Sequence, residues 1–172
     1  MQPKADPKAV TYIIITIIIV CVIAAAVYLA GYGDDGTNMN PKNANTFKSG
    51  ELSFKYPKAW STQPESELTE KEQLTALEYA RDTTFYCNVF KYDEAPDMLM
   101  FLYDLEEDKN ITINGKQAYL SKNKIEGLTT SKSIFIVDSK NNTYRIQFVT
   151  LTSSGNKMDK VIQQVINSIR VN

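Results

Sequence analysis

The stretch Gly50–Trp60, GELSFKYPKAW, sets the start of the folded part of the chain. Apolar and polar residues alternate over Leu52–Tyr56, which is the period of a half-buried β-strand. Gly50 allows a turn before this strand, and Pro57 ends it because proline has no N–H to donate to a neighbouring strand. We expect Trp60, the single tryptophan, to fill the core just beyond the strand.

Downstream of this strand the chain alternates strand patterns with turn signals. We expect strands at Leu74–Asp82, Thr83–Tyr92, Lys116–Lys124, Ser131–Asp138 and Thr143–Leu151. Asn114-Gly115 is a residue pair that tight hairpin turns prefer, and Lys140–Asn142 connects the last two strands. The polar, acidic stretch Ser61–Gln73 is expected to be a loop. Together these patterns predict an antiparallel sheet.

Two segments change to a helical period. The shorter one, Asp93–Asp108, has Pro96 in its first turn, and its apolar residues are expected to face the core: Met98, Phe101, Leu102 and Leu105. The longer one, Asn156–Val171, carries one unbroken apolar stripe: Met158, Val161, Ile162, Val165, Ile166 and Ile169. We expect the longer helix to close the sheet.

Upstream of the strand lies an uncharged apolar run, residues 9–31. A bilayer core about 30 Å thick needs roughly 20 apolar helical residues, so the run predicts a single transmembrane helix. The tail, residues 1–8, carries Lys4 and Lys8, and the positive-inside rule therefore keeps this tail in the cytoplasm. Residues 32–46 predict a flexible linker, and residues 47–172 predict one extracytoplasmic domain.

Two alternative interpretations of the apolar run remain open. The first is a cleaved signal peptide, with Thr11–Ile23 as its apolar region and Ala24–Ala26 as its cleavage site. The run continues to be apolar through Ala30, which favours a membrane helix instead. The second is a pilin-type leader, but the early part of the run contains no glutamate.

Composition excludes several kinds of chemistry. The 172 residues include 19 basic and 20 acidic ones, and no basic patch predicts binding to nucleic acid. The chain has no histidine, so it lacks the commonest general base and the commonest zinc ligand. Cys21 lies in the apolar run and Cys87 in a predicted strand, so the outer domain cannot close an internal disulfide. We expect no cofactor and no metal site.

Two sequons for N-linked glycosylation lie in the predicted outer domain. They are Asn110-Ile111-Thr112 and Asn141-Asn142-Thr143. Both are expected at turns, where a glycan attached to Asn110 or Asn141 would point into solvent.

The order of these elements resembles the PsbP-like family. The pieces that carry the resemblance are Gly50–Trp60, Asn114–Tyr119, Thr143–Phe148 and Val165–Val171, and the resemblance spans nearly all of residues 47–172. It implies the α+β class: an α/β/α sandwich around a central antiparallel sheet. Plant members are extrinsic subunits of the photosynthetic water-splitting complex, and others are anchored or exported proteins. Metal-binding histidines of parts of the family have no counterpart in this sequence.

These observations predict a non-catalytic, membrane-tethered extracytoplasmic module that binds a partner protein at the outer surface. The expected contact surface is the sheet face or edge that the terminal helix leaves uncovered. One alternative is a hydrolase that uses carboxylates such as Glu78, Asp82 or Asp93, and another is a pilin-like envelope structural protein. An enzyme needs convergent polar groups with shifted pKa values, whereas a binding module needs exposed apolar side chains.

Overall fold

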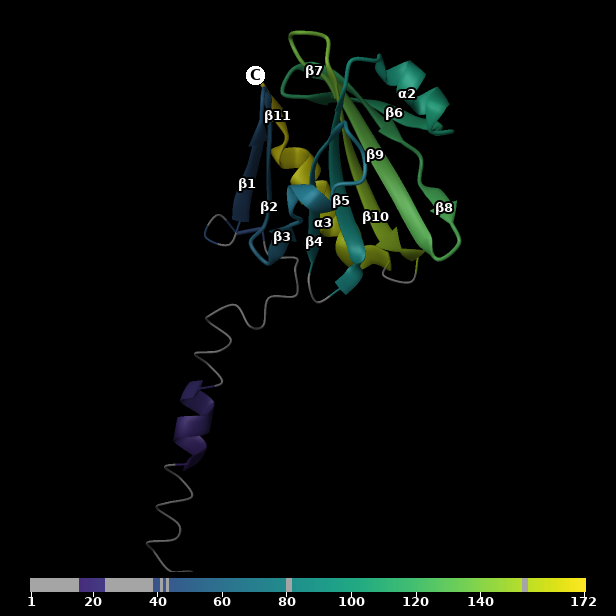
Figure 1. The fold of residues 1–172 in the computed structure, drawn as a ribbon. Helices are drawn as coiled ribbons and strands as arrows, with labels where there is room; N and C mark the ends of the chain where they lie inside the picture. The colour runs from purple at the N-terminus through teal and green to yellow at the C-terminus, as the bar shows by residue number, and fades with distance from the viewer. Residues whose placement is uncertain (1–15, 24–38, 41, 43, 80–81, 153–154) are drawn as a thin grey trace, which may run out of the picture. The chain divides into compact units, whose positions relative to one another are not determined.

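The computed structural model describes residues 16–23, 39–40, 42, 44–79, 82–152 and 155–172, without the side chains of residues 82–84 and 155–157. The chain divides into two compact units, Met1–Asp35 and Gly36–Asn172. Figure 1 shows the strands and helices of the second unit.

In the first unit, residues 16–23 form a helix whose apolar side chains are exposed. No helix among the described residues is both long and apolar enough to cross a membrane. The predicted tail 1–8, both ends of the predicted span 9–31 and most of the predicted linker 32–46 lie outside the described residues.

Most strands of the second unit form one eight-stranded sheet with the order β3-β4-β5-β10-β9-β7-β6, in which β8 also pairs with β9. The strands are β3 (Trp60–Thr62), β4 (Gln73–Tyr79), β5 (Asp82–Tyr92), β6 (Glu107–Ile113), β7 (Lys116–Ser121), β8 (Lys124–Glu126), β9 (Thr129–Val137) and β10 (Thr143–Leu151). The pairings between them are antiparallel, as the sequence predicts. The predicted loop before β4 also contains a short 3-10 helix, η2 (Glu65–Glu67).

A second, three-stranded sheet has the order β1-β2-β11, with β1 (Ala44–Ser49), β2 (Leu52–Pro57) and β11 (Arg170–Val171). β2 ends at Pro57, as predicted. β1 begins at Ala44, so residues 44–46 belong to a strand and not to the predicted linker. Backbone pairing with β2 orders this polar segment, and Phe47 packs against the core.

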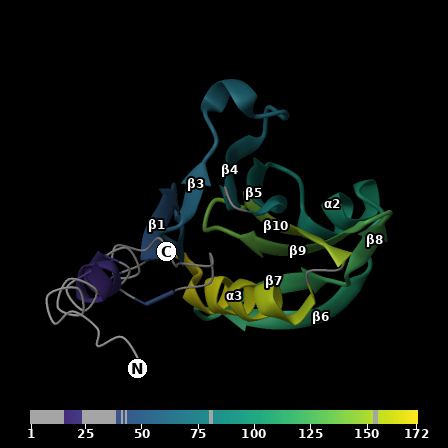
Figure 2. The same ribbon diagram turned by 90° about the horizontal axis from the view of Figure 1, so that it is seen from below.

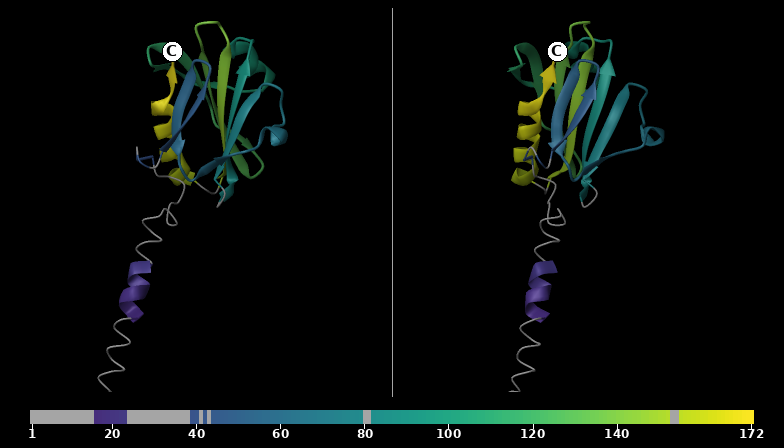
Figure 3. Two further views of the ribbon diagram at one scale, coloured as in Figure 1. Left: turned by 60° about the vertical axis from the view of Figure 1, so that its left-hand side comes forward. Right: turned by 90° about the vertical axis from the view of Figure 1, so that its left-hand side faces the viewer.

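Helix α3 (Gly155–Ser168) covers one face of the large sheet (Figure 2). All six residues of the predicted stripe are buried: Met158, Val161, Ile162, Val165, Ile166 and Ile169. Trp60 is also buried in this core, as predicted. The helix ends earlier than predicted, because Arg170 and Val171 pair with Ser53 and Leu52 of β2 as strand β11 (Figure 3).

Helix α2 (Pro96–Leu102) lies on the opposite face and is much shorter than the predicted segment. It begins at Pro96, as predicted. Of the four apolar residues predicted to face the core, Leu105 packs against it, but the prediction is wrong for the other three. Leu99 and Met100 are buried, while Met98, Phe101 and Leu102 are 52%, 81% and 62% exposed. The helix makes only about two turns, and the chain leaves it through Asp104, whose φ is 51°. The sheet therefore contacts Leu99, Met100 and the segment that follows the helix.

Candidate functional site

The three carboxylates of the hydrolase alternative do not converge. β5 starts at Asp82, and Asp93 follows its other end, so these two residues are on the order of 30 Å apart at about 3.3 Å per strand residue. Glu78 lies on β4 and accepts a hydrogen bond from Gln63 Nε2 at 3.2 Å. Asp93 is exposed to solvent. Asp93 therefore lies too far from Asp82 to pair with it, and the side chain of Asp82 lies outside the described residues.

The described residues contain no group of three or more histidine, cysteine, aspartate or glutamate side chains that could hold a metal ion. Cys87 is fully buried in β5, and burial raises the pKa of its thiol well above the usual value. Because the thiolate is the nucleophilic form, this environment makes Cys87 an inert core residue. Cys21, in the first unit, is exposed.

Two carboxylates with lowered pKa values hold turns together. Asp138 accepts hydrogen bonds from the backbone N–H groups of Lys140 and Asn142, at 2.8 and 2.9 Å, and from the Asn142 side chain. Burial alone would raise the pKa of Asp138, but these hydrogen bonds outweigh it and lower the pKa. Glu51 accepts hydrogen bonds from the hydroxyl and the backbone N–H of Ser139, which lower its pKa. Asp138 therefore stabilises the turn between β9 and β10, and Glu51 joins the turn between β1 and β2 to it.

Gly50, in the turn between β1 and β2, closely approaches a side chain of strand β10. Its φ is 56°, and a Cβ built on it would lie 2.6 Å from the buried Tyr144 Oη. Burial, followed by the charge of Asp138, raises the pKa of the Tyr144 phenol. The turn residues around Gly50 thus form a tightly packed structural contact.

A buried arginine, which sequence reasoning missed, joins α2 to the large sheet. Arg145 is only 4% exposed, and its Cζ lies 4.0 Å from the centre of the Tyr103 ring. The rings of Phe90 and Phe135 lie 5.6 and 5.9 Å from the same atom. Arg145 Nε donates a hydrogen bond to Ser133 Oγ at 3.1 Å. The guanidinium thus stacks within an aromatic layer between the sheet and the end of α2.

Beside the aromatic layer, this face carries a row of paired amide side chains. Gln73 Nε2 donates to Asn88 Oδ1 at 3.2 Å, and Asn88 Nδ2 donates to Gln147 Oε1 at 3.3 Å. Near the aromatic layer, the hydroxyls of Tyr92 and Tyr103 lie 2.9 Å apart, and burial raises the pKa of Tyr92. The sheet face predicted as a contact surface is therefore covered in part by α2 and carries paired amides beside it.

Two grooves flank the C-terminal half of α3. The first, about 440 Å³, lies between α3 and β2, and the second, about 430 Å³, lies between α3 and β6. The charged side chains among their described lining residues are all cations: Lys55 and Arg170 in the first, Lys109 and Arg170 in the second. Arg170 Nη1 donates to Ile169 O at 2.7 Å, which holds this side chain at the end of the helix. The grooves therefore present positive charge on both sides of α3.

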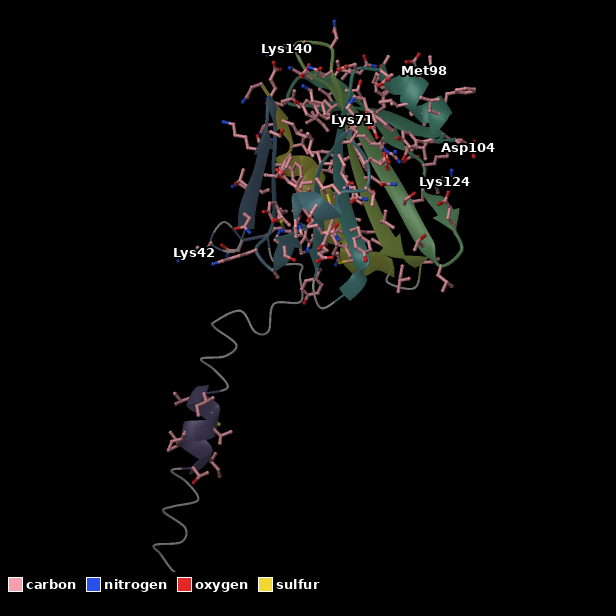
Figure 4. The ribbon with its side chains drawn as sticks, in the orientation of Figure 1. Lys42, Lys71, Met98, Asp104, Lys124 and Lys140 are labelled. Atoms are coloured by element: carbon pink, nitrogen blue, oxygen red, sulfur yellow. The ribbon has the colours of Figure 1, made fainter. Side chains whose placement is uncertain are left out.

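Exposed apolar side chains gather on α2 and around β8. In addition to the α2 residues, Ile125 and Leu128 are 65% and 79% exposed. Lys124 Nζ donates to Tyr103 O at 3.1 Å and lies 3.8 Å from Asp104 Oδ2, so the start of β8 meets the end of α2. Figure 4 shows Met98 on α2 and Lys124 beside Asp104.

The two sequons differ in their surroundings. Asn141 is exposed in the turn between β9 and β10, with a φ of 63°. Asn110, expected at a turn, lies instead within strand β6, where its Oδ1 accepts a hydrogen bond from Gln117 Nε2 at 3.2 Å. Strand β6 begins at Glu107, within the segment predicted as helical. Its first four residues are exposed and polar, so they give no sequence pattern that predicts a strand.

The arrangement of strands and helices is similar to that of a solved structure, cyanobacterial PsbP (CyanoP) from Synechocystis sp. PCC 6803. The TM-score is 0.59 at 8% sequence identity, over 78% of this chain and 96% of that chain. The fold is PsbP-like.

A crystal structure from Bacteroides thetaiotaomicron VPI-5482 is also similar to this PsbP-like chain, with a TM-score of 0.50 and 13% identity over 76% of this chain. The match spans 49% of that longer protein. No family model matches the sequence, and no curated protein matches it. At these identities the similarity concerns the fold alone.

Proposed function

We propose that this chain is a non-catalytic, membrane-tethered accessory module that binds a partner protein outside the cytoplasm. Residues 9–31 serve as the anchor and residues 47–172 as the binding domain. The uncharged apolar run and the lysines that precede it support this orientation. A reporter enzyme fused after Asn172 is expected to be active only outside the cytoplasm, and protection of the domain from protease added to intact cells would contradict the orientation.

The pair of cationic grooves beside α3 carries the binding proposal. Arg170 lines both grooves, with Lys55 on one side of the helix and Lys109 on the other. The whole chain has a formal charge of −1, so this positive region stands out from the average surface. Complementary charge steers partners and fixes their register. We therefore expect the partner to present an acidic surface or segment.

The tether strengthens such a contact. A module and a partner confined to one membrane meet at a raised effective concentration, so a weak contact is sufficient. On the opposite face of the sheet, the exposed apolar residues of α2, Met98, Phe101 and Leu102, offer a separate contact area.

Cross-linking in intact membranes tests this function. A photo-reactive amino acid at Asn167, which lines both grooves, is expected to yield a defined adduct with one membrane-associated protein. The same amino acid at Thr62, exposed on the far edge of the sheet, is the positional control. Arg170→Glu combined with Lys109→Glu is expected to remove the adduct, while Lys140→Glu in an exposed turn is expected to preserve it. An adduct unaffected by the groove substitutions would contradict the proposal.

A further inference from the structure

We propose that the uncharged half of β6, Asn110–Ile113, is a docking site where an extended, acidic segment of a partner protein adds a strand to the large sheet. This inference rests on the proposed function, because it states how a partner would occupy the groove between α3 and β6. It also names the partner's chemistry: a short extended peptide whose groove-facing side chains include both carboxylates and apolar groups.

β6 lies at the end of the large sheet and pairs with β7. The described residues provide no strand on its other side, so this edge presents backbone N–H and C=O groups to which another strand can bond. The register with β7 is continuous from Asn110, opposite Tyr119, to Ile113, opposite Lys116. This part of β6 is therefore regular enough to continue the sheet.

The two halves of β6 differ in their protection against such pairing. The first half contains Glu107, Asp108 and Lys109 and a register shift between Glu107 and Lys109. Charges and bulges are the devices by which edge strands avoid pairing with other chains. Asn110–Ile113 has neither a charge nor a register shift. The unprotected half is thus limited to these four residues.

The other sheet edges are less suited to strand addition. β3 and β11 are three and two residues long. β1 is longer, but the exposed charge of Lys48 within it opposes pairing with another strand. Thr46 is also the single described residue of β1 that lines the groove beside α3. β6 instead supplies a run of residues to its own groove: Lys109, Ile111, Thr112 and Ile113.

The groove beside β6 fits the side chains of an added strand. Its apolar lining comprises Ile111, Ile113, Leu120 and Ile166, and its charged lining residues are Lys109 and Arg170. Because successive side chains of a strand point to opposite faces, every second side chain of an added strand would face this groove. Apolar side chains would contact Ile111 and Ile166, and carboxylates would reach Lys109 and Arg170. Backbone bonds supply the affinity in this mode, and side-chain pockets supply the specificity.

The test uses the full chain in detergent and a fluorescent octapeptide of the sequence EEVVEEVV, which places glutamate and valine in turn along each face of a strand. Binding is measured by anisotropy. Two matched peptides separate charge from backbone pairing. One replaces each glutamate with lysine, and the other keeps every side chain but is N-methylated at every residue. We expect both to bind at least about tenfold more weakly, the first from charge repulsion and the second from lost N–H donors.

Hydrogen–deuterium exchange and variants locate the site. The glutamate–valine peptide is expected to slow exchange at Asn110–Ile113 and to leave β1 and β3 unchanged. Lys109→Glu is expected to weaken binding about tenfold, and the matched Lys140→Glu variant is expected to leave it unchanged.

The outcomes distinguish this inference from the function on which it rests. Equal binding of the N-methylated peptide, with the same sensitivity to Lys109→Glu, would overturn strand addition and leave a charged groove that binds acidic segments. Slowed exchange at β1 or β3 in place of β6 would overturn the site. Absence of binding by every peptide would overturn both the strand addition and the acidic partner.

Discussion

The two faces of the large sheet are built on different principles. The face under α3 is continuously apolar, with Ile146 and Val165 both fully buried. The face under α2 combines Phe90 and Phe135 with the buried cation of Arg145. The stability of the α3 face therefore depends on the volume of its side chains. The stability of the α2 face depends in addition on the contacts that Arg145 makes with aromatic rings and polar groups.

The largest expected effect comes from removing volume on the α3 face. Ile146→Ala leaves a cavity in a core that α3 closes, and we expect it to lower the free energy of unfolding by about 4 kcal/mol. Urea denaturation of the full chain followed by tryptophan fluorescence measures this, because Trp60 lies in the same core. Ile125→Ala, at a 65% exposed position, is the control and is expected to change little. A loss below about 1 kcal/mol for Ile146→Ala would contradict a tightly packed core.

The second effect concerns Arg145 on the α2 face. Arg145→Ala removes the stacked guanidinium and its hydrogen bond to Ser133, and we expect a loss of about 3 kcal/mol. Arg145→Met fills similar volume without a charge, so it keeps most of the packing in the aromatic layer and removes the desolvation cost of a buried cation. We therefore expect Arg145→Met to cost about 1 kcal/mol in the same denaturation assay.

Comparing the losses in free energy of unfolding for Arg145→Ala and Arg145→Met shows whether the two faces are stabilised in different ways. If methionine destabilised the protein as much as alanine does, the cation and its aromatic partners would carry the energy of this face. If methionine were nearly neutral, the α2 face would depend mainly on volume, like the α3 face.

These faces also differ in how far the sequence predicts them. The six-residue stripe of α3 and the alternation in β2 and β10 place Val165 and Ile146 in the core, because the period of the pattern matches the element. The α2 segment misleads, because Phe101 and Leu102 share a helical face that no sheet residue covers. Its buried residues, Leu99 and Met100, form a face with Tyr103 at positions i, i+1 and i+4, and this is not the predicted face.

The candidate sites were less predictable than the fold. Arg145 alternates with buried residues of β10 like any outward-facing polar residue, and its contact with Tyr103 arises only when α2 folds back on the sheet. The cationic grooves bring together residues far apart in sequence, such as Lys55 and Arg170. The expectation that an uncovered edge of the sheet serves binding remains a prediction, and β6 is the edge to which the structure directs it.

The third effect concerns Asp138 in the turn between β9 and β10, two strands that contribute side chains to both faces of the sheet. Asp138→Ala removes the acceptor for the N–H groups of Lys140 and Asn142, and we expect a loss of about 2 kcal/mol at neutral pH. The pKa of Asp138 is lowered in the folded state, so its charged form contributes stability above the unfolded pKa of about 3.9. That contribution is lost as the pH falls through the folded pKa.

Denaturation midpoints between pH 7 and pH 2 measure this contribution, with Asp138→Asn as the matched variant. The asparagine does not titrate, so the advantage of the parent over the variant is expected to shrink at acid pH. The charge of Asp138 raises the pKa of Glu51, so both proteins are compared in a Glu51→Gln background, which removes the titration of Glu51. A difference that stayed constant with pH would contradict the assignment to Asp138.

The smallest effect is expected at the margin of the α2 face. Lys122 Nζ lies 2.6 Å from Glu106 Oε2. The hydrogen bond from Lys122 is the main cause that lowers the pKa of Glu106, and the charge of Lys122 is the second. The two side chains are 57% and 76% exposed, so water and salt screen the attraction. The backbone already joins the same two residues, because Lys122 N donates to Glu106 O at 2.7 Å. We therefore expect Lys122→Met and Glu106→Gln, alone or combined, to leave the denaturation midpoint unchanged within error at moderate salt. A coupling between the two substitutions that persists in high salt would show that this pair is shielded from water, and polar contacts on the α2 face would then matter well beyond the buried Arg145 layer.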